Sequence, residues 1–286
     1  MLQVARLAPT LLGESKDLVA SFLRRTQNPD GGFQDRAGAS DIYYTVFGLE
    51  GLLALREPLP AATSDYLRQF GDGASLDFVH LTCLARAWAT CSRSGPPAEI
   101  REAIARRLQQ HRSADGGFAL VPSADVGSAY ACFLALGALE DLGAEVEPTG
   151  VRDCLQGLRS NDGAYANLPG ATEGSTPATA AAVMVLHQLG YQADPQVADW
   201  LTRRCHPDGG FFAAPRAPLP DLLSTATSLH ALSARQCDFG PLREPCLDFV
   251  DSLWTNRGGF YGNWMDQTLD CEYTYYGLLA LGHLSL

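Results

Sequence analysis

The chain has 286 residues, a hydrophobic content of 46% and a formal net charge of −11. This acidic balance argues against nucleic acid as a partner, because phosphate binding requires clusters of Lys and Arg. The sequence has no apolar stretch of membrane-spanning length and no secretory signal at its start, and none of its eight cysteines forms a C-x-x-C pair. We therefore expect a reduced, cytoplasmic protein.

The first predicted elements form a helical hairpin. Residues 15–27 carry apolar side chains at helical spacing, and a Gly-rich turn at residues 28–32 ends this helix. Phe33 follows the turn, and we expect its side chain to fill an apolar pocket between neighbouring repeat units. After a short loop, residues 41–55 predict a second helix that is apolar on nearly all sides and therefore buried.

The Gly-Gly-Phe turn of this hairpin returns along the chain. Its copies end at Phe33, Phe118, Phe211 and Phe260, with a variant copy at Gly163-Ala164-Tyr165. An acid stands before each apolar second helix, and successive acids lie 36 to 49 residues apart: Asp41, Asp77, Asp125, Glu173, Asp221 and Asp270. A period of this size is typical of a repeat architecture.

The repeat predicts six helical hairpins, at about 15–56, 62–93, 99–143, 149–190, 195–235 and 243–286. The last hairpin stays apolar to the final residue, so it lacks the polar cap that an open solenoid needs. The first hairpin can supply the missing partner surface. We therefore predict an all-α protein, an α6–α6 barrel (toroid) that forms a single domain over residues 1–286.

The recurrent acids have two interpretations. Asp125, Glu173 and Asp221 are expected to cap helices, because a carboxylate at a helix N-terminus accepts free backbone N–H groups. In a closed ring, the N-termini of the six second helices also meet at one rim. Their partial positive charge there suits an anionic group such as a diphosphate.

The Gly-Gly-Phe turn, followed by a second helix that opens D-x-x-Y-[ST]-x-x-x-L, resembles the repeat of the prenyltransferase and squalene-cyclase family. The resemblance covers essentially the whole chain and is greatest to the β subunits of protein prenyltransferases. It implies an α/α barrel with a central aromatic-lined cavity for an isoprenoid diphosphate. It also implies a zinc ion that activates a substrate thiolate, and a helical-repeat partner subunit.

One alignment with the family uses the first two hairpins. The segment GGFQDRAGASDIYY places Arg36 on the diphosphate arginine and Asp41 on the zinc Asp. Tyr43 then stands where the family has the zinc Cys, and LDFVHLT places His80 on the zinc His. This set offers no thiolate, although zinc prefers thiolate and imidazole ligands.

A second alignment uses the last hairpin. The segment LDCEYTYYGLLAL places Asp270 on the zinc Asp and Glu272 on the Cys, while Tyr44 of the first hairpin replaces the His. Oxygen donors suit magnesium better than zinc. Taken together, the two alignments imply a metal at Asp41, His80 or Asp270, with zinc and magnesium as alternatives. These residues and Glu272 are the catalytic candidates.

Tyrosines near the starts of the second helices are candidates for contact with an isoprenoid, because aromatic rings suit an apolar chain and stabilise an allylic cation. They are Tyr43, Tyr44, Tyr273 and Tyr276. The favoured function is a prenyltransferase-like enzyme whose ligand is an isoprenoid diphosphate or another apolar small molecule. The alternatives are a non-catalytic isoprenoid or lipid-binding barrel, a scaffold subunit, and a terpene-cyclase-like enzyme, although the D-x-D-D pattern of squalene-type cyclases is missing.

Overall fold

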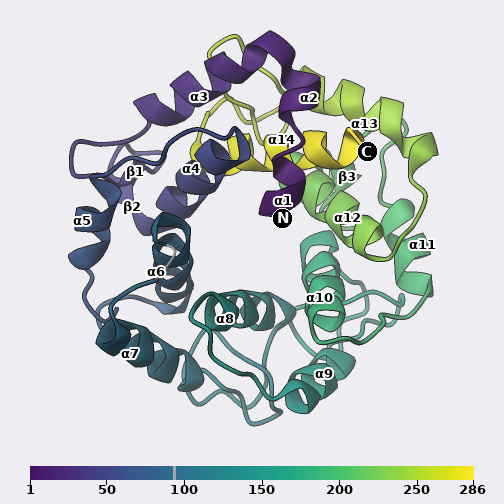
Figure 1. Cartoon of the computed structure of the whole chain (residues 1–286). Helices are drawn as coiled ribbons and strands as arrows, with labels where there is room; N and C mark the ends of the chain where they lie inside the picture. Colours follow the sequence, from purple (N-terminus) through teal and green to yellow (C-terminus); the bar gives the residue numbers. More distant parts are fainter. Residues whose placement is uncertain (93–94) are drawn as a thin grey trace. The chain divides into compact units, whose positions relative to one another are not determined.

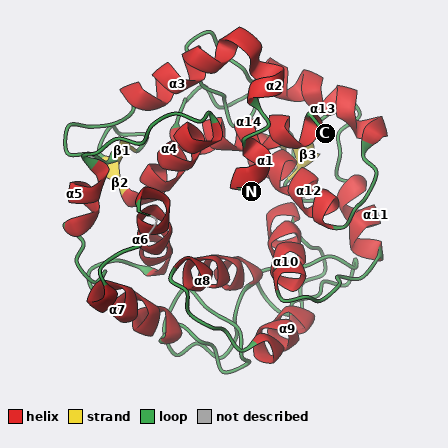
Figure 2. Ribbon diagram, viewed as in Figure 1, coloured by secondary structure: helices red, strands yellow, loops and turns green. Residues whose placement is uncertain are grey.

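The computed structural model describes residues 1–92 and 95–286, and these are mainly helices joined by loops (Figure 2). Residue 93, the last of the second predicted hairpin, lies outside the described residues. The chain divides into two compact units, Met1–Asp65 with Leu201–Leu286, and Tyr66–Trp200. Within the described ranges, none of the helices combines the length and hydropathy that a membrane span requires.

The first unit joins the beginning of the chain to its end. Its elements are α1 (Leu2–Ala5), α2 (Pro9–Leu12), the 3-10 helix η1 (Gly13–Ser15), α3 (Lys16–Arg25), β1 (Phe33–Gln34), β2 (Ser40–Asp41), α4 (Ile42–Ala54), β3 (Phe211–Phe212), β4 (Pro220–Asp221), α12 (Leu222–Ala234), α13 (Gly240–Ser252) and α14 (Cys271–Leu284). The apolar helix α14 packs between α4 and α12 (Figure 1). Helix α3 packs on α4, and helix α13 packs on α14. In the first and last hairpins, the two helices therefore pack against each other.

The second unit repeats the same arrangement. It contains α6 (Phe78–Cys91), α7 (Ala98–Gln109), α8 (Ala129–Asp141), α9 (Pro148–Gly157) and α10 (Thr176–Gln188). The apolar helix α8 packs between α6 and α10, and α7 packs on α6 and α8. The unit boundaries fall within two short helices, α5 (Thr63–Arg68) and α11 (Gln196–Thr202).

Two short antiparallel strand pairs occupy part of the segments that we expected to be loops. β1 pairs with β2, with Phe33 opposite Asp41, and β3 pairs with β4, with Phe211 opposite Asp221. Both phenylalanines are fully buried. Each strand pair therefore ties the acid that begins a helix to the buried side chain of the preceding turn.

Four of the recurrent acids cap helices. These residues accept backbone N–H groups of the first turns of α4, α6, α12 and α14, and they are Asp41, Asp77, Asp221 and Asp270. An N-cap of this kind contributes about 0.5–2 kcal/mol. The prediction for Asp221 is therefore confirmed.

The predicted caps at Asp125 and Glu173 are wrong. Helix α8 is capped by Ser128, which accepts the N–H of Ala131 at 3.1 Å, and α10 by Ser175 in the same way. The reason is that the helices begin a few residues later than the acids. A serine hydroxyl satisfies the free N–H groups as well as a carboxylate does.

The apolar C-terminal helix packs against the N-terminal hairpin, as its composition predicts. Helix α14 contacts α1 and α4. A Cβ atom on Gly282 would meet the carbonyl oxygen of Val4 at 2.1 Å, and one on Gly258 would meet that of Leu18 at 2.2 Å. Gly258 also has a φ of +94°, which favours glycine. Within the first unit, the first and last repeats are therefore in direct contact.

Candidate active site

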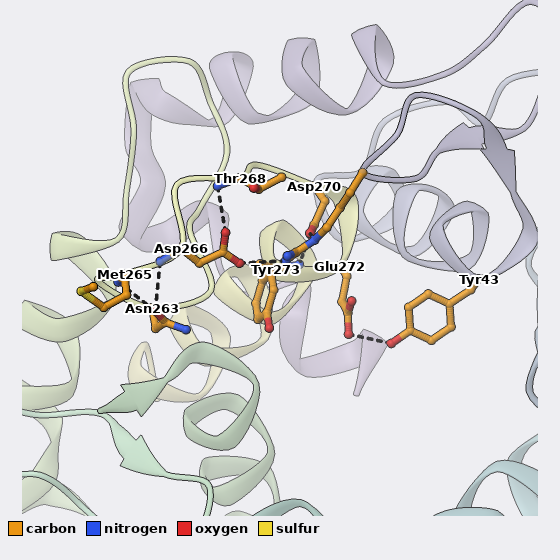
Figure 3. Close-up of polar contacts among 9 residues, drawn as sticks. Tyr43, Asn263, Met265, Asp266, Thr268, Asp270, Glu272 and Tyr273 are labelled. Atoms are coloured by element: carbon orange, nitrogen blue, oxygen red, sulfur yellow. Dashed lines mark hydrogen bonds and ion pairs between the residues drawn. The ribbon is translucent and has the colours of Figure 1, made fainter. Parts of the chain in front are cut away.

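Asp270 begins α14 and is buried beside a guanidinium group. Asp270 is only 3% exposed. Its Oδ1 accepts the backbone N–H of Tyr273 at 2.8 Å, and its Oδ2 accepts the Nε–H of Arg36 at 2.9 Å (Figure 3). Burial raises the pKa of Asp270, although both partners oppose the shift. Both oxygens of this carboxyl group therefore have fixed partners inside the protein.

Arg36 lies in the loop before α4 and bridges two carboxylates. Its Nη2 lies 3.0 Å from Oδ2 of Asp266, and its guanidinium stacks over the ring of Tyr273 at 5.3 Å. Partial burial works to lower the pKa of Arg36, but Asp270 and Asp266 raise it. Two acids thus neutralise this charge. The pairing weighs against Arg36 as a diphosphate arginine, and that assignment stays a prediction.

Glu272 is an acid in the first turn of α14, and its Oε1 accepts the hydroxyl of Tyr43 at 2.6 Å (Figure 3). Burial raises the pKa of Glu272 to about 7, with Asp270 adding to the shift while Tyr43 and Arg36 oppose it. Protonated and ionised forms are therefore both populated near neutral pH. Since Tyr43 belongs to α4, two helices distant in sequence build this site together.

The four predicted tyrosines lie in the first two turns of α4 and α14. Tyr43 and Tyr276 both pack on Phe47, with ring centroids 5.0 and 5.6 Å away, and the ring of Tyr44 lies 5.5 Å from that of Tyr43. Burial and the nearby carboxylates raise the pKa of Tyr44, and burial raises that of Tyr273 to about 12. Tyr43, Tyr44 and Tyr276 therefore form one aromatic cluster with Phe47, whereas Tyr273 lies beside Arg36. Their role as substrate contacts stays a prediction.

Asp41 holds the first turn of α4 in place. Its Oδ1 accepts the backbone N–H groups of Tyr43 and Tyr44, at 2.8 and 3.2 Å. Asp41 thereby positions the helix turn that presents Tyr43 to Glu272. Its assignment as a catalytic residue or metal ligand stays a prediction.

His80 belongs to the second unit and lies in the first turn of α6. Its Nδ1 lies 2.8 Å from Oδ1 of Asp77, and its backbone N–H donates to the same oxygen at 2.9 Å. The pKa of Asp77 is lowered overall. Burial acts to raise it, but the two contacts from His80 outweigh burial. This ring nitrogen is thus directed at the cap of its own helix. The assignment of His80 as a catalytic or metal residue also stays a prediction.

The donor atoms at the start of α14 do not fit a zinc ion. Both oxygens of Asp270 and one oxygen of Glu272 already accept hydrogen bonds. The Sγ atom of Cys271 lies 3.0 Å from Oγ1 of Thr26, and burial raises the pKa of Cys271 to about 12. The side chain is then a thiol, whereas zinc binds thiolate. Among the residues that the structure describes, no group of three or more His, Cys, Asp or Glu could hold a metal ion.

Sequence analysis missed Asp266, the second partner of Arg36. Asp266 accepts the backbone N–H of Thr268 at 3.0 Å, and Asn263 fixes the same segment by accepting the N–H of Asp266 at 3.0 Å (Figure 3). Asp266 occupies no periodic position of the repeat. Its one sequence signal is an acid four residues before the cap Asp270, which is too weak to identify it.

Comparison with known families identifies the class of the protein. The family described as the prenyltransferase alpha-alpha toroid domain matches residues 11–84, 83–197 and 178–285. The chain therefore belongs to this family, and the predicted all-α toroid class is confirmed. No curated protein sequence matches the chain.

Solved structures of similar fold carry different activities. A type II terpene cyclase, MstE from Scytonema in complex with geranylgeranyl dihydroxybenzoate, has 15% identity and a TM-score of 0.65, with 97% of each chain covered. The Candida albicans protein geranylgeranyltransferase-I complexed with GGPP has 15% identity and a TM-score of 0.63, covering 94% of this chain and 90% of that one. A D-mannose isomerase has 14% identity and a TM-score of 0.67, covering 97% and 98%. At such identities the likeness shows the fold alone.

Proposed function

We propose that the protein is an enzyme that processes an isoprenoid by proton transfer at the start of α14. The observation that carries the proposal is Glu272, a half-buried carboxyl group with a pKa of about 7 and a 2.6 Å hydrogen bond from Tyr43. A catalytic acid or base works best when its pKa lies near the operating pH. Carboxyl groups shifted in this way are concentrated at active sites.

An isoprenoid is the ligand class that the surroundings of Glu272 favour. The tyrosines of α4 and α14, together with Phe47, place aromatic rings beside the acid, and such rings stabilise a developing carbocation. Two structures of similar fold are described with geranylgeranyl compounds. The D-mannose isomerase of the same fold shows that the fold by itself does not select the ligand.

In the proposed reaction Glu272 first acts as an acid. Its Oε1 accepts the hydroxyl of Tyr43, so the transferable proton is on Oε2. This proton adds to one carbon of a substrate double bond, the π electrons form the new C–H bond, and the neighbouring carbon becomes a cation. The carboxylate of Glu272 then takes back a proton from an adjacent carbon, which forms a new double bond and restores the acid.

A second candidate is a prenyltransferase-like enzyme that binds an isoprenoid diphosphate and transfers the prenyl chain. It is favoured by Arg36, which lies beside the N-termini of α4 and α14 with its side chain 40% exposed. Helix N-termini attract phosphate groups. Arg36 has to exchange at least one of its two carboxylate partners for the diphosphate, which disfavours this candidate.

The test offers the purified protein three compounds: geranylgeraniol, geranylgeranyl diphosphate and geranylgeranyl dihydroxybenzoate. Binding is measured by calorimetry, and products are identified by mass spectrometry and NMR. We expect Glu272→Gln to reduce conversion by about 10²-fold or more, because the proton donor is lost, while the ligand still binds. The exposed Glu102 supplies the matched control, and Glu102→Gln should leave conversion unchanged.

Each result separates the candidates. Conversion that survives in Glu272→Gln contradicts the proton-transfer proposal. Transfer from the diphosphate that is lost in Arg36→Ala supports the prenyltransferase-like enzyme instead. Binding by the wild type without conversion of any of the three compounds supports a non-catalytic isoprenoid-binding protein, and no binding of any of them overturns the isoprenoid proposal.

A further inference from the structure

The second unit contains a cavity of about 350 Å³ that the proposed reaction does not use. One wall is a face of α9 and the residues just after it, with Arg152, Gln156 and Arg159 spaced by one helical turn. The lining also includes Leu186, Tyr191 and Asp194, from the end of α10 and the segment that follows it. A volume of this size suits a small metabolite.

The third residue of the variant repeat motif, Tyr165, lines this cavity. In the other copies the third residue is a phenylalanine that is 0–2% exposed, whereas here it is Tyr165, which is 4% exposed and lines the cavity. A buried tyrosine usually supplies its hydroxyl group to a polar partner. The repeat therefore departs from its pattern at a residue that lines a cavity.

Two guanidinium groups are held on tyrosine rings in the same cavity. Arg159 stacks over Tyr165 and Arg152 stacks over Tyr191, each with the guanidinium carbon 5.2 Å from the ring centroid. Stacking fixes the plane of a guanidinium and directs its N–H groups outward along the edges. Paired N–H groups in that arrangement recognise carboxylate and phosphate oxygens.

Each of these arginines has one carboxylate partner, which a ligand oxyanion has to share or displace. Asp194 lies 3.4 Å from Nη2 of Arg159 and accepts the N–H of Gln196 at 2.9 Å, which holds it at the start of α11. Asp153 does not line the cavity, but its Oδ1 accepts both Nε–H and Nη2–H of Arg152, at 2.9 and 2.7 Å. The lining thus concentrates two of the chain's arginines, each balanced by one aspartate, in a chain of net charge −11.

We propose that this cavity binds a small organic anion whose carboxylate or phosphate group is held by Arg152 and Arg159 and accepts a hydrogen bond from Tyr165. The body of the ligand packs on Leu186 and the ring of Tyr191. This site is independent of the proton-transfer site, because all its residues belong to the second unit. Failure of either proposal therefore leaves the other untouched.

The test is calorimetry at low ionic strength with sodium benzoate and sodium phosphate as separate probes. We expect saturable binding of at least one probe to the wild type, and the better binder distinguishes a carboxylate from a phosphate ligand. The double variant Arg152→Gln/Arg159→Gln should bind at least about tenfold more weakly, since charge-assisted hydrogen bonds are lost. Arg106→Gln removes the same charge from an exposed position of α7 and should bind as the wild type does.

Tyr165→Phe restores the residue that the other copies of the repeat use, so it tests the hydroxyl without endangering the fold. We expect it to weaken binding by about three- to tenfold, the value of one hydrogen bond. Circular dichroism melting confirms that each variant is folded. If neither probe shows saturable binding at concentrations up to about 50 mM, where even a very weak site would be filled, the proposal is overturned. Undiminished binding by the double variant overturns it as well.

Discussion

The charge state of Glu272 depends on a small set of neighbours. Burial and the negative charge of Asp270 favour its protonated form, whereas the Tyr43 hydroxyl and Arg36 favour the ionised form. Arg36 also opposes the raised pKa of Asp270 and is itself held by Asp266. Replacing Arg36 should therefore alter the titration of both acids, so this arginine controls the site even without contacting a substrate.

The raised pKa of Glu272 makes the free energy of unfolding depend on pH. The pKa is 4.5 for an unperturbed glutamate and about 7 for Glu272 in the folded protein, so the folded state binds more protons between these two pH values. Stability from this group is fully present below about pH 4.5 and is lost as the pH rises through 7. At about 1.4 kcal/mol per pKa unit, the loss is about 3 kcal/mol.

The measurement is urea unfolding of the wild type and Glu272→Gln at several values between pH 4.5 and 8. The stability difference, wild type minus variant, should fall by about 3 kcal/mol across this range, because only the wild type carries the titrating acid. Glu102→Gln serves as the control and should show a constant difference. A constant difference for Glu272→Gln as well would falsify the environment that we describe for this carboxyl group.

At the scale of the element, serine rather than the periodic acid starts two helices. The hydroxyl of Ser128 accepts the N–H of Ala131 at 3.1 Å in α8. We expect Ser128→Ala to lower the free energy of unfolding by about 1 kcal/mol, the usual value of an N-cap. Asp125→Ala removes the exposed acid three residues earlier and should change it by less than about 0.5 kcal/mol.

Chemical denaturation of the two variants measures the difference, and Ser128→Asp is the rescue, since aspartate is an equally good cap. A larger loss in Asp125→Ala than in Ser128→Ala would return the capping role to the acid. The same comparison can be made in α10, where Ser175 is the cap and Glu173 the periodic acid.

These elements show what the sequence can and cannot reveal. Hydrophobic periodicity and the glycine turns predict the hairpins, because both report local backbone preferences. The start of a helix depends on which of two nearby polar side chains reaches the free N–H groups, and the period favoured Asp125 over Ser128. The short strand pairs were missed because two residues carry no pattern.

The candidate site depends on contacts that no local pattern encodes. The family resemblance led to Arg36, Tyr43, Asp270 and Glu272, and the structure brings these four together. The structure also gives Arg36 a second carboxylate partner, Asp266, which the family resemblance did not indicate. The salt bridge from Arg36 to Asp266 joins residues 230 positions apart, and such a pair becomes visible only when the first and last repeats are packed together.

At the scale of the whole molecule, the chain ends stabilise each other within the first unit. A Cβ atom on Gly258 would meet the carbonyl oxygen of Leu18 at 2.2 Å, whereas one on Gly38 would meet nothing within 4 Å. Both glycines have positive φ, +94° and +89°, so alanine at either position suffers similar backbone strain. The two substitutions therefore differ only in the contact between the first and last repeats.

We expect Gly258→Ala to destabilise the protein by about 1–3 kcal/mol more than Gly38→Ala, because the inserted methyl group pushes the α3 backbone away. Hydrogen exchange should rise together in α3 and α14, since α14 packs on α4 and α4 on α3. Gly38→Ala should raise exchange only in its own loop. If Gly258→Ala instead raises exchange near residue 258 alone, the two ends of the chain unfold independently and do not share a cooperative unit.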